Sequence, residues 1–231
     1  IRRMGVQFGE TAVILGVGLL GQIAVQVAKT AGYKVIAIDV NEERVKLAKS
    51  QGADRGLVIG KDNIVDEVLH LTQGIGADAV AIYAATSSSE PVLQAMKMAR
   101  KKAKIVVVGD VGMKLEREPF YEKELDFLIS RSYGPGRYDE LYEEKGLDYP
   151  IEYVRWTENR NMQAFLDLLK TGKADVKPLI SRVFSIDEAF NAYQYMMQSE
   201  ERPLGVLLKY DPSKYVTEEH GLKVECKIPI T

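Results

Sequence analysis

The stretch Thr11-Ala-Val-Ile-Leu-Gly16-Val-Gly18-Leu-Leu-Gly21 decides the fold of this 231-residue chain. The apolar run Thr11–Leu15 has no polar alternation, which is typical of a strand covered on both faces. The three glycines after it match the spacing G-x-G-x-x-G. In such a turn the first glycine permits a tight bend, the second lets the backbone approach a pyrophosphate, and the third lets a helix pack closely on the strand. The start of that helix then directs free N–H groups toward the phosphates.

The residues after this glycine turn (Gly16–Gly21) follow the order of a dinucleotide-binding unit. We predict a helix over Leu19–Ala31, with Gly32 where a glycine commonly ends a helix. Its apolar stripe consists of Leu20, Ile23, Ala24, Val27, Ala28 and Ala31. A second strand then ends in Asp39, which lies 18 residues after Gly21, close to the spacing at which a carboxylate accepts hydrogen bonds from ribose hydroxyls. The structural alternative is a glycine turn beside a surface aspartate.

Strands and helices continue to alternate along the chain. The later strands are expected over Gly56–Ile59, Ala77–Tyr83, Ile105–Val108 and Leu125–Ser132. Of the helices between them, we expect one to be capped by Asn41 and the next by Asp62. A third is expected to begin near Pro91 and to end near Arg100. The basic cluster Arg100, Lys101, Lys102 and Lys104 is interpreted as complementing the dipole at that helix end. This alternation predicts an α/β fold with a doubly wound, parallel, six-stranded Rossmann sheet.

The pattern breaks over residues 133–160, where loop residues precede a stretch rich in tyrosine and charge. This insertion is either an ordered surface segment or a lid or partner surface near the cofactor cleft. A helix capped near Thr157 or Asn159 follows, then a strand over Pro178–Phe184, and a capping box at Ser185–Glu188. The next helix is expected to place Ala189, Phe190, Tyr193, Met196 and Met197 in a core, before a last strand at Gly205–Lys209. We expect four parts: 1–135, the dinucleotide-binding domain; 136–160, an insertion; 161–210, a returning C-terminal segment; and 211–231, a tail or linker.

Composition excludes several classes of protein. The net charge of −2 and pI of about 5.9 give no electrostatic case for nucleic acid or an anionic membrane. No apolar run approaches the roughly 20 residues of a membrane span. The single cysteine, Cys226, excludes an internal disulfide framework and favours a reducing compartment, so we expect a cytoplasmic protein. The chain begins at Ile1 without methionine, and we expect it to be a piece of a longer protein.

The run GVGLLGQIAVQVAKTAGYKVIAIDVNEERVKLAKSQGAD resembles the coenzyme domain of medium-chain, zinc-type alcohol-dehydrogenase-like oxidoreductases. The later KPLISRVFSIDEAFNAYQYM and PLGVLLKY resemble the segment with which that family returns to its catalytic domain, here largely absent. The resemblance implies NAD as cofactor, NADP less so, with a small hydroxyl or carbonyl substrate and a homodimer or other homo-oligomer. YGPGRYD and YVRWTENRN resemble a subgroup fused to a second sugar-type oxidoreductase domain, often linked to polysaccharide biosynthesis.

The family's catalytic zinc ligands have no counterpart here. Nothing before Gly16 supplies the expected set of Cys, His and Glu ligands, and Cys226, His70 and His220 are not clustered, so no zinc site is expected in this fragment. His70 is interpreted as a solvent-facing helix residue. No catalytic residue is identified, and we expect the fragment alone to be inactive.

The predicted cofactor contacts lie at the glycine turn, after the second strand, and after the fourth and fifth strands. They are Gly16, Val17, Gly18, Leu19, Leu20, Gly21, Asp39, Val40, Arg44, Ala84, Ala85, Thr86, Val108, Gly109 and Asp110. The last six are expected at the nicotinamide, on the carboxyl edge of the sheet. A 2′-phosphate would meet the Asp39 carboxylate, which favours NAD over NADP. Arg44 is either an adenosine contact paired with Asp39 or a solvated helix residue.

Three other classes compete with this interpretation. A short-chain dehydrogenase would need Tyr-x-x-x-Lys on a helix, and the only such spacing, Tyr210 to Lys214, contains Pro212. An S-adenosylmethionine-dependent methyltransferase shares the first strand, turn and acid, but the third glycine and the strand pattern stand against it. A non-catalytic nucleotide-binding module remains open because the zinc ligands are missing.

Overall fold

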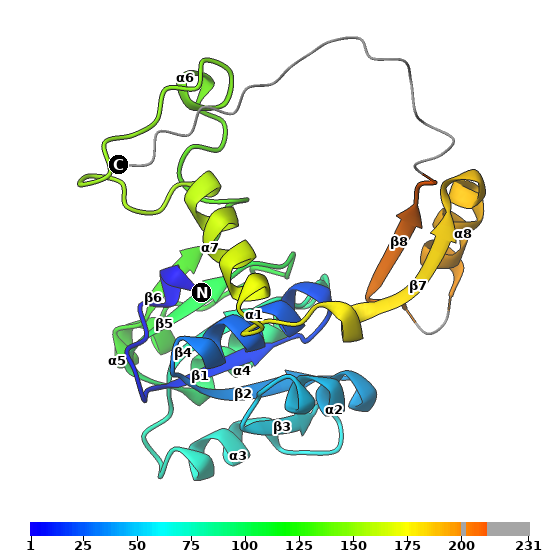
Figure 1. The fold of residues 1–231 in the computed structure, drawn as a ribbon. Coiled ribbons are helices and arrows are strands. Elements are labelled where there is room, and N and C mark those ends of the chain that lie inside the picture. The colour runs from blue at the N-terminus through cyan, green and yellow to red at the C-terminus, as the bar shows by residue number, and fades with distance from the viewer. Residues whose placement is uncertain (200–201, 212–231) are drawn as a thin grey trace. The chain divides into compact units, whose positions relative to one another are not determined.

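The computed structural model describes residues 1–199 and 202–211, which fall into two compact units (Figure 1). The first unit is Ile1–Leu179, and the second begins at Ile180. Lys214, His220, Cys226 and nearly all of the expected tail lie outside the described residues. The functional division at residues 135, 160 and 210 stays a prediction.

The first unit is built on a six-stranded parallel sheet, which confirms the predicted fold class. The strand order is β3-β2-β1-β4-β5-β6, so the order reverses between β1 and β4. The carboxyl ends of parallel strands share one edge, and ligands of such sheets bind beside this reversal. The strands are β1 (Thr11–Leu15), β2 (Lys34–Asp39), β3 (Arg55–Val58), β4 (Ala77–Ile82), β5 (Ala99–Val107) and β6 (Asp126–Ile129).

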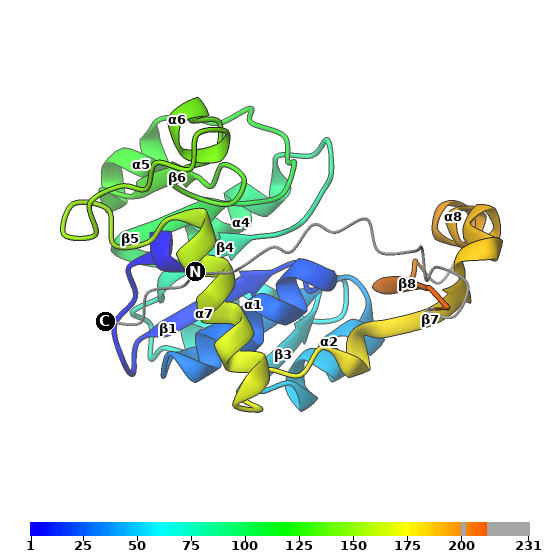
Figure 2. The same ribbon diagram turned by 45° about the horizontal axis from the view of Figure 1, so that its top comes forward.

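Helices cover both faces of this sheet (Figure 2). They are α1 (Leu19–Thr30), α2 (Glu42–Ser50), α3 (Ile64–Leu71), α4 (Glu90–Met98) and the short α5 (Glu118–Lys123). The first unit also contains α7 (Glu158–Lys170), with one 3-10 turn at Arg2–Met4 and another at Lys177–Leu179. Val13 and Leu15 of β1 join the core under α3 and α4, while Ala12 and Ile14 join the core under α1 and α2. Because both faces of β1 are buried, its sequence shows no polar alternation.

Two expected features of the helix ends are wrong. Asn63, not Asp62, caps α3, since the Asp62 carboxylate reaches back to accept the N–H of Val58 at 2.6 Å. The basic cluster does not end a helix: α4 stops at Met98, and Arg100, Lys101, Lys102 and Lys104 lie in β5. The C-terminus of α4 is capped instead by Lys123, whose Nζ donates to the carbonyls of Met96, Lys97 and Ala99 at 2.8 Å each.

The buried face of α1 is shifted from the predicted stripe. Leu20 is 61% exposed, while Gln22 and Gln26 are buried. Gln26 makes reciprocal hydrogen bonds with the backbone of Asp175: its Nε2 donates to the carbonyl at 3.0 Å, and its Oε1 accepts the N–H at 2.6 Å. These bonds satisfy the buried amide and attach α1 to the chain that follows α7.

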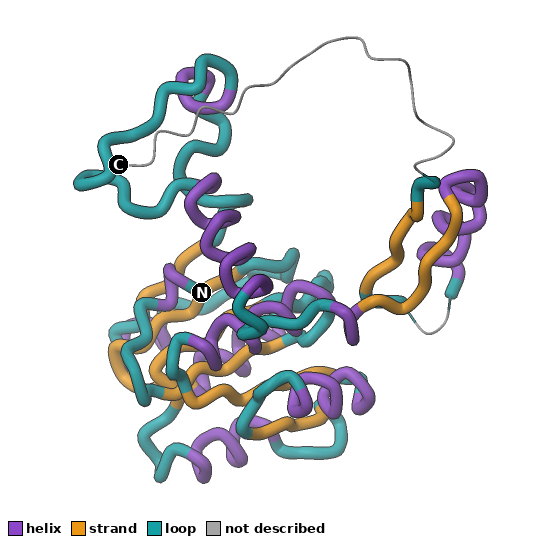
Figure 3. Tube along the Cα trace, in the orientation of Figure 1, coloured by secondary structure: helices purple, strands orange, loops and turns teal. Residues whose placement is uncertain are grey.

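The segment between β6 and α7 is mostly loop, with the short helix α6 (Glu140–Glu143) inside it (Figure 3). Its end is fixed by Thr157, whose side chain accepts the N–H of Arg160 and caps α7, as predicted. Within residues 1–199 and 202–211, no helix combines the length and apolarity that crossing a bilayer requires.

The second unit pairs β7 (Ile180–Ser185) with β8 (Gly205–Lys209) in parallel, around a 3-10 turn (Ile186–Glu188) and α8 (Ala189–Gln198). The predicted capping box of Ser185 and Glu188 is present. The predicted core positions are wrong: Phe190, Tyr193, Met196 and Met197 are exposed, the last by 83%, and Ala192 is the residue of α8 that is buried. Periodicity identifies the apolar face of a helix, but the described residues of this unit do not cover it.

Candidate dinucleotide-binding site

The first and third glycines of the turn are required by packing. Gly16 has a φ of +93°, and a Cβ added there would lie 2.7 Å from the backbone nitrogen of Ala84. A Cβ on Gly21 would lie 2.1 Å from the carbonyl oxygen of Gly16. Both distances are far inside van der Waals contact, which confirms the predicted tight turn and close approach of helix to strand.

Gly18 has different surroundings. It is the N-cap of α1 with ordinary extended dihedrals, and a Cβ there would meet nothing within 4 Å. The N–H groups of the first helical turn have no partners within their own helix, and the positive end of the helix dipole lies here. The backbone at Gly18 is therefore open to an anionic ligand at a helix start.

Asp39 holds the site together. It is 6% exposed at the end of β2, and its Oδ2 accepts the N–H of Val17 at 2.7 Å. Its Oδ1 accepts the N–H of Asn41 at 2.9 Å. One carboxylate thus ties the glycine turn to the start of α2. An ionised carboxylate offers about four lone-pair directions, so two of them stay available for hydroxyl donors.

Gln22 is a site residue that the sequence reasoning missed. It is fully buried behind the glycine turn, and its Nε2 donates to the carbonyl of Val17 at 3.0 Å and to that of Arg44 at 2.8 Å. Its Oε1 is buried without a hydrogen-bond partner among the described residues. Its position directly after the third glycine indicates a place close to the turn, but a glutamine in a helix is ordinarily assigned to the solvent face.

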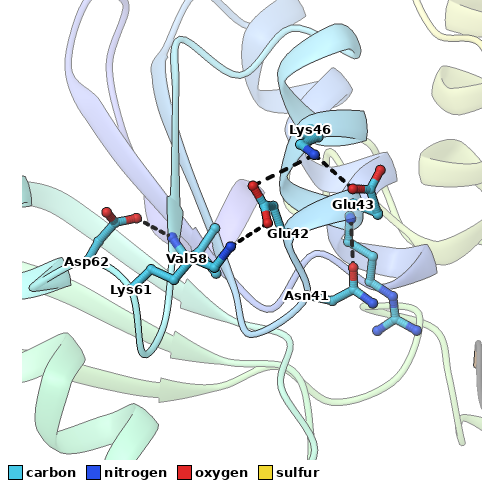
Figure 4. Close-up of polar contacts among 8 residues, drawn as sticks. Asn41, Glu42, Glu43, Lys46, Val58, Lys61 and Asp62 are labelled. Atoms are coloured by element: carbon cyan, nitrogen blue, oxygen red, sulfur yellow. Dashed lines mark hydrogen bonds and ion pairs between the residues drawn. The ribbon is translucent and has the colours of Figure 1, made fainter.

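The first turn of α2 carries a charge network beside Asp39 (Figure 4). The side chain of Asn41 accepts the N–H of Arg44 at 3.1 Å and caps the helix, as predicted. Lys46 lies 2.8 Å from Glu43 and 3.7 Å from Glu42, and Glu42 also pairs with Lys61. The hydrogen bond from Lys61, followed by the charge of Lys46, lowers the pKa of the Glu42 carboxyl. The exposed Val40 precedes this network.

The loops after β4 and β5 lie together, as predicted. The N–H of Thr86 donates to the carbonyl of Asp110 at 2.8 Å, and that of Gly109 donates to the carbonyl of Ile82 at 3.0 Å. A Cβ on Gly109 would lie 2.0 Å from the carbonyl oxygen of Ala84, so glycine is required there. The structure therefore brings Ala84–Thr86 and residues 108–110 to the same edge of the sheet.

In the part of the chain that the structure describes, no three His, Cys, Asp or Glu side chains are grouped as metal ligands. His70 is exposed on α3, as predicted.

The strand order and the glycine turn at its reversal define a doubly wound nucleotide-binding domain. The chain belongs to the zinc-binding dehydrogenase family, whose model matches residues 20–145. This membership confirms the resemblance to alcohol-dehydrogenase-like oxidoreductases.

Known relatives agree with this membership. The chain is 25% identical over 211 residues to D-arabitol-phosphate dehydrogenase of Enterococcus avium, covering 89% of this chain and 52% of the relative. It is 35% identical over 119 residues to an NAD-dependent alcohol dehydrogenase of Sulfurisphaera tokodaii, covering 50% of this chain and 33% of the relative. An alcohol dehydrogenase from E. coli CFT073, solved in complex with NADH, shares the fold with a TM-score of 0.68 at 21% identity, covering 89% of this chain and 53% of that one. The chain spans about half the length, or less, of these proteins.

Proposed function

We propose that this chain is the NAD(H)-binding part of a dehydrogenase that transfers a hydride between nicotinamide and a hydroxyl-bearing carbon of an alcohol, polyol or sugar. The observation that carries the proposal is the open backbone at Gly18, in front of the helix start at the reversal of strand order. Family membership supports it, because the match spans α1 to α6.

The residues present fit a dinucleotide. The N–H groups that follow Gly18, on Leu19 and Leu20, would receive the pyrophosphate. Asp39 would accept ribose hydroxyls, with Val40 and Arg44 beside the adenosine. Ala84–Thr86 and residues 108–110 would hold the nicotinamide. When bound, NAD supplies the hydride chemistry, and the role of these residues is to hold and orient it.

The charges around Asp39 support NAD over NADP. A 2′-phosphate would stand beside a buried carboxylate whose two oxygens already hold the backbone and cannot turn away. Two like unit charges ~4 Å apart cost about 4 kcal/mol at an effective dielectric of 20, which is close to a thousandfold in affinity.

The proposal also covers the location of the catalytic groups, the substrate and the assembly of the whole protein. We infer that the catalytic groups, with any zinc ligands, lie in the part of the relatives that this chain does not span. A small-molecule substrate, a homo-oligomeric state and a cytoplasmic location are inferred with it, and the link to polysaccharide biosynthesis stays a prediction.

Titration of the purified chain with NADH tests the proposal. We expect saturable enhancement of NADH fluorescence, no binding of S-adenosylmethionine in calorimetry, and no oxidation of simple alcohols with NAD. Binding of S-adenosylmethionine instead of NADH would assign the chain to the methyltransferases. Robust turnover of a simple alcohol would refute the inference that the catalytic groups lie elsewhere.

A further inference from the structure

The loop that follows β6 contains a run of residues with left-handed backbones. Four residues within 132–138 have left-handed backbones: Ser132 at φ +49°, Gly134 and Gly136 at +106°, and Tyr138 at +66°. Two of these are not glycine, and such conformations cost free energy and cluster at ligand sites.

This loop gathers arginine and tyrosine side chains. The guanidinium of Arg131 lies 4.3 Å from the centre of the Tyr138 ring, and that of Arg137 lies 4.4 Å from the same ring and 5.5 Å from Tyr133. Tyr133 and Tyr138 are 64% and 56% exposed. Planar aromatic faces and guanidinium groups therefore stand together at the surface.

Two carboxylates of the loop already have partners. Glu143 pairs with Arg137, and Asp139 accepts the hydroxyl of Tyr149. Arg131 makes no ion pair with any residue in 1–199 or 202–211, and the buried Nε of Arg137 has no hydrogen-bond partner there.

The groups around Tyr138 act on its phenol. A hydrogen bond with Ser132, then Arg137, and more weakly Arg131, lower the pKa of the Tyr138 phenol.

The cluster begins at the carboxyl edge of the sheet, where we propose that the nicotinamide binds. Ile129 of β6 pairs with Val107 of β5, and the N–H of Ser130 donates to the carbonyl of Val107 at 2.8 Å. Arg131 thus leaves the sheet directly beside the chain that continues into Gly109 and Asp110. Figure 1 shows β6 next to β5 and the loop continuing toward α6.

We propose that Arg131 and Tyr138 form a subsite for an oxyanion, either phosphate or carboxylate, carried by a polyol or sugar substrate. The guanidinium would bind the oxyanion through paired N–H donors, and the tyrosine faces would pack against the carbon chain or ring. This inference rests on the proposed function, since it places the charged end of the substrate beside the reacting end of the cofactor.

The experiment is an NMR titration of the whole 231-residue chain with inorganic phosphate and, separately, with acetate, each with and without NADH. We expect amide shifts within residues 131–143, and the anion that binds more tightly identifies the charged group of the substrate. Shifts confined to the glycine turn or to other residues would overturn the subsite. The NADH titration is read separately, so failure of the cofactor proposal is distinguishable.

Three variants sharpen the test. Arg131→Gln should weaken anion binding at least about tenfold, because losing a single charge-assisted hydrogen bond already costs that much affinity. Arg131→Lys should retain part of the affinity because it keeps the charge. Arg155→Gln is the matched control: its guanidinium also lies against an aromatic ring, 4.0 Å from Trp156, and it should change nothing. Wild-type anion affinity in Arg131→Gln, or an equal loss in Arg155→Gln, would refute the assignment. All three variants should bind NADH as the wild type does.

Discussion

Replacing Gly18 with valine should separate cofactor binding from folding. The dihedrals of Gly18, φ −67° and ψ −165°, suit any L-residue, and the added carbons would meet no protein atom within 4 Å of the Cβ position. We therefore expect unfolding free energy within about 0.5 kcal/mol of wild type, as for an ordinary surface substitution. The same carbons would fill the space that the pyrophosphate needs. Losing two hydrogen bonds to its charged oxygens, at ~1.5–3 kcal/mol each, would weaken NADH binding by a factor of at least about 100.

Gly21→Ala is the matched control, because its Cβ would lie 2.1 Å from the carbonyl oxygen of Gly16. Overpacking of this kind costs about 1–3 kcal/mol, and each kcal/mol lowers the Tm of a domain of this size by about 2–4 °C. Calorimetry with NADH measures the affinity, and thermal unfolding followed by circular dichroism measures the stability. The reasoning is refuted if Gly18→Val binds NADH with wild-type affinity, or if it destabilises the fold as much as Gly21→Ala does.

Three further substitutions probe other contacts. Asp39→Ser should shift the cofactor preference toward NADPH, and it should also cost about 1–3 kcal/mol of stability because the buried N–H of Val17 loses its acceptor. Dissociation constants for NADH and NADPH, measured on wild type and variant, test the preference. Tighter binding of NADPH than of NADH by the wild type would contradict the role of Asp39. For Asp54, burial raises the carboxyl pKa, but hydrogen bonds led by that from Lys29 outweigh burial and leave it lowered. Its contribution to stability is then full above the ordinary carboxyl pKa and is lost as the pH falls through the lowered pKa. Asp54→Asn should therefore reduce the loss of unfolding free energy on acidification, measured by urea unfolding at a series of pH values. An unchanged dependence on acid pH would contradict this prediction. Gln26→Leu should lower the free energy of unfolding by about 1–3 kcal/mol by leaving the backbone groups of Asp175 unpaired, and an unchanged urea midpoint would show that this pair contributes nothing.

Features set by local chemistry could be predicted from the sequence. The glycine turn follows from backbone sterics, and the caps at Asn41 and Thr157 follow from side chains that reach their own helix. The last strand, Gly205–Lys209, has the predicted bounds. The carboxyl-edge loops meet because parallel strands must end together, so Thr86 and Asp110 could be paired before any coordinates.

Features set by tertiary contacts could not be predicted. Gln22 and Gln26 look like solvent-side residues of α1, but each is buried and donates to a backbone carbonyl far along the chain, that of Arg44 and that of Asp175. The sequence pattern predicts Arg100 at a helix end, but the register of β5 on β4 places it beside Asp78, to which its Nε donates at 2.6 Å. Arg131 gave no periodic signal, because its significance depends on the neighbouring strand end.

The cap that Lys123 places on α4 makes this lysine a natural reporter of local opening. Burial lowers the pKa of its ammonium group, which by itself would make the amine more reactive toward acylating reagents. Its three N–H bonds to the carbonyls of Met96, Lys97 and Ala99 hold the amine, so acylation requires these bonds to break first. The rate of modification at Lys123, relative to the exposed Lys101 and Lys102 on β5, therefore measures how often this cap on α4 opens. Mass spectrometry would read this rate in the unaltered chain, without any substitution.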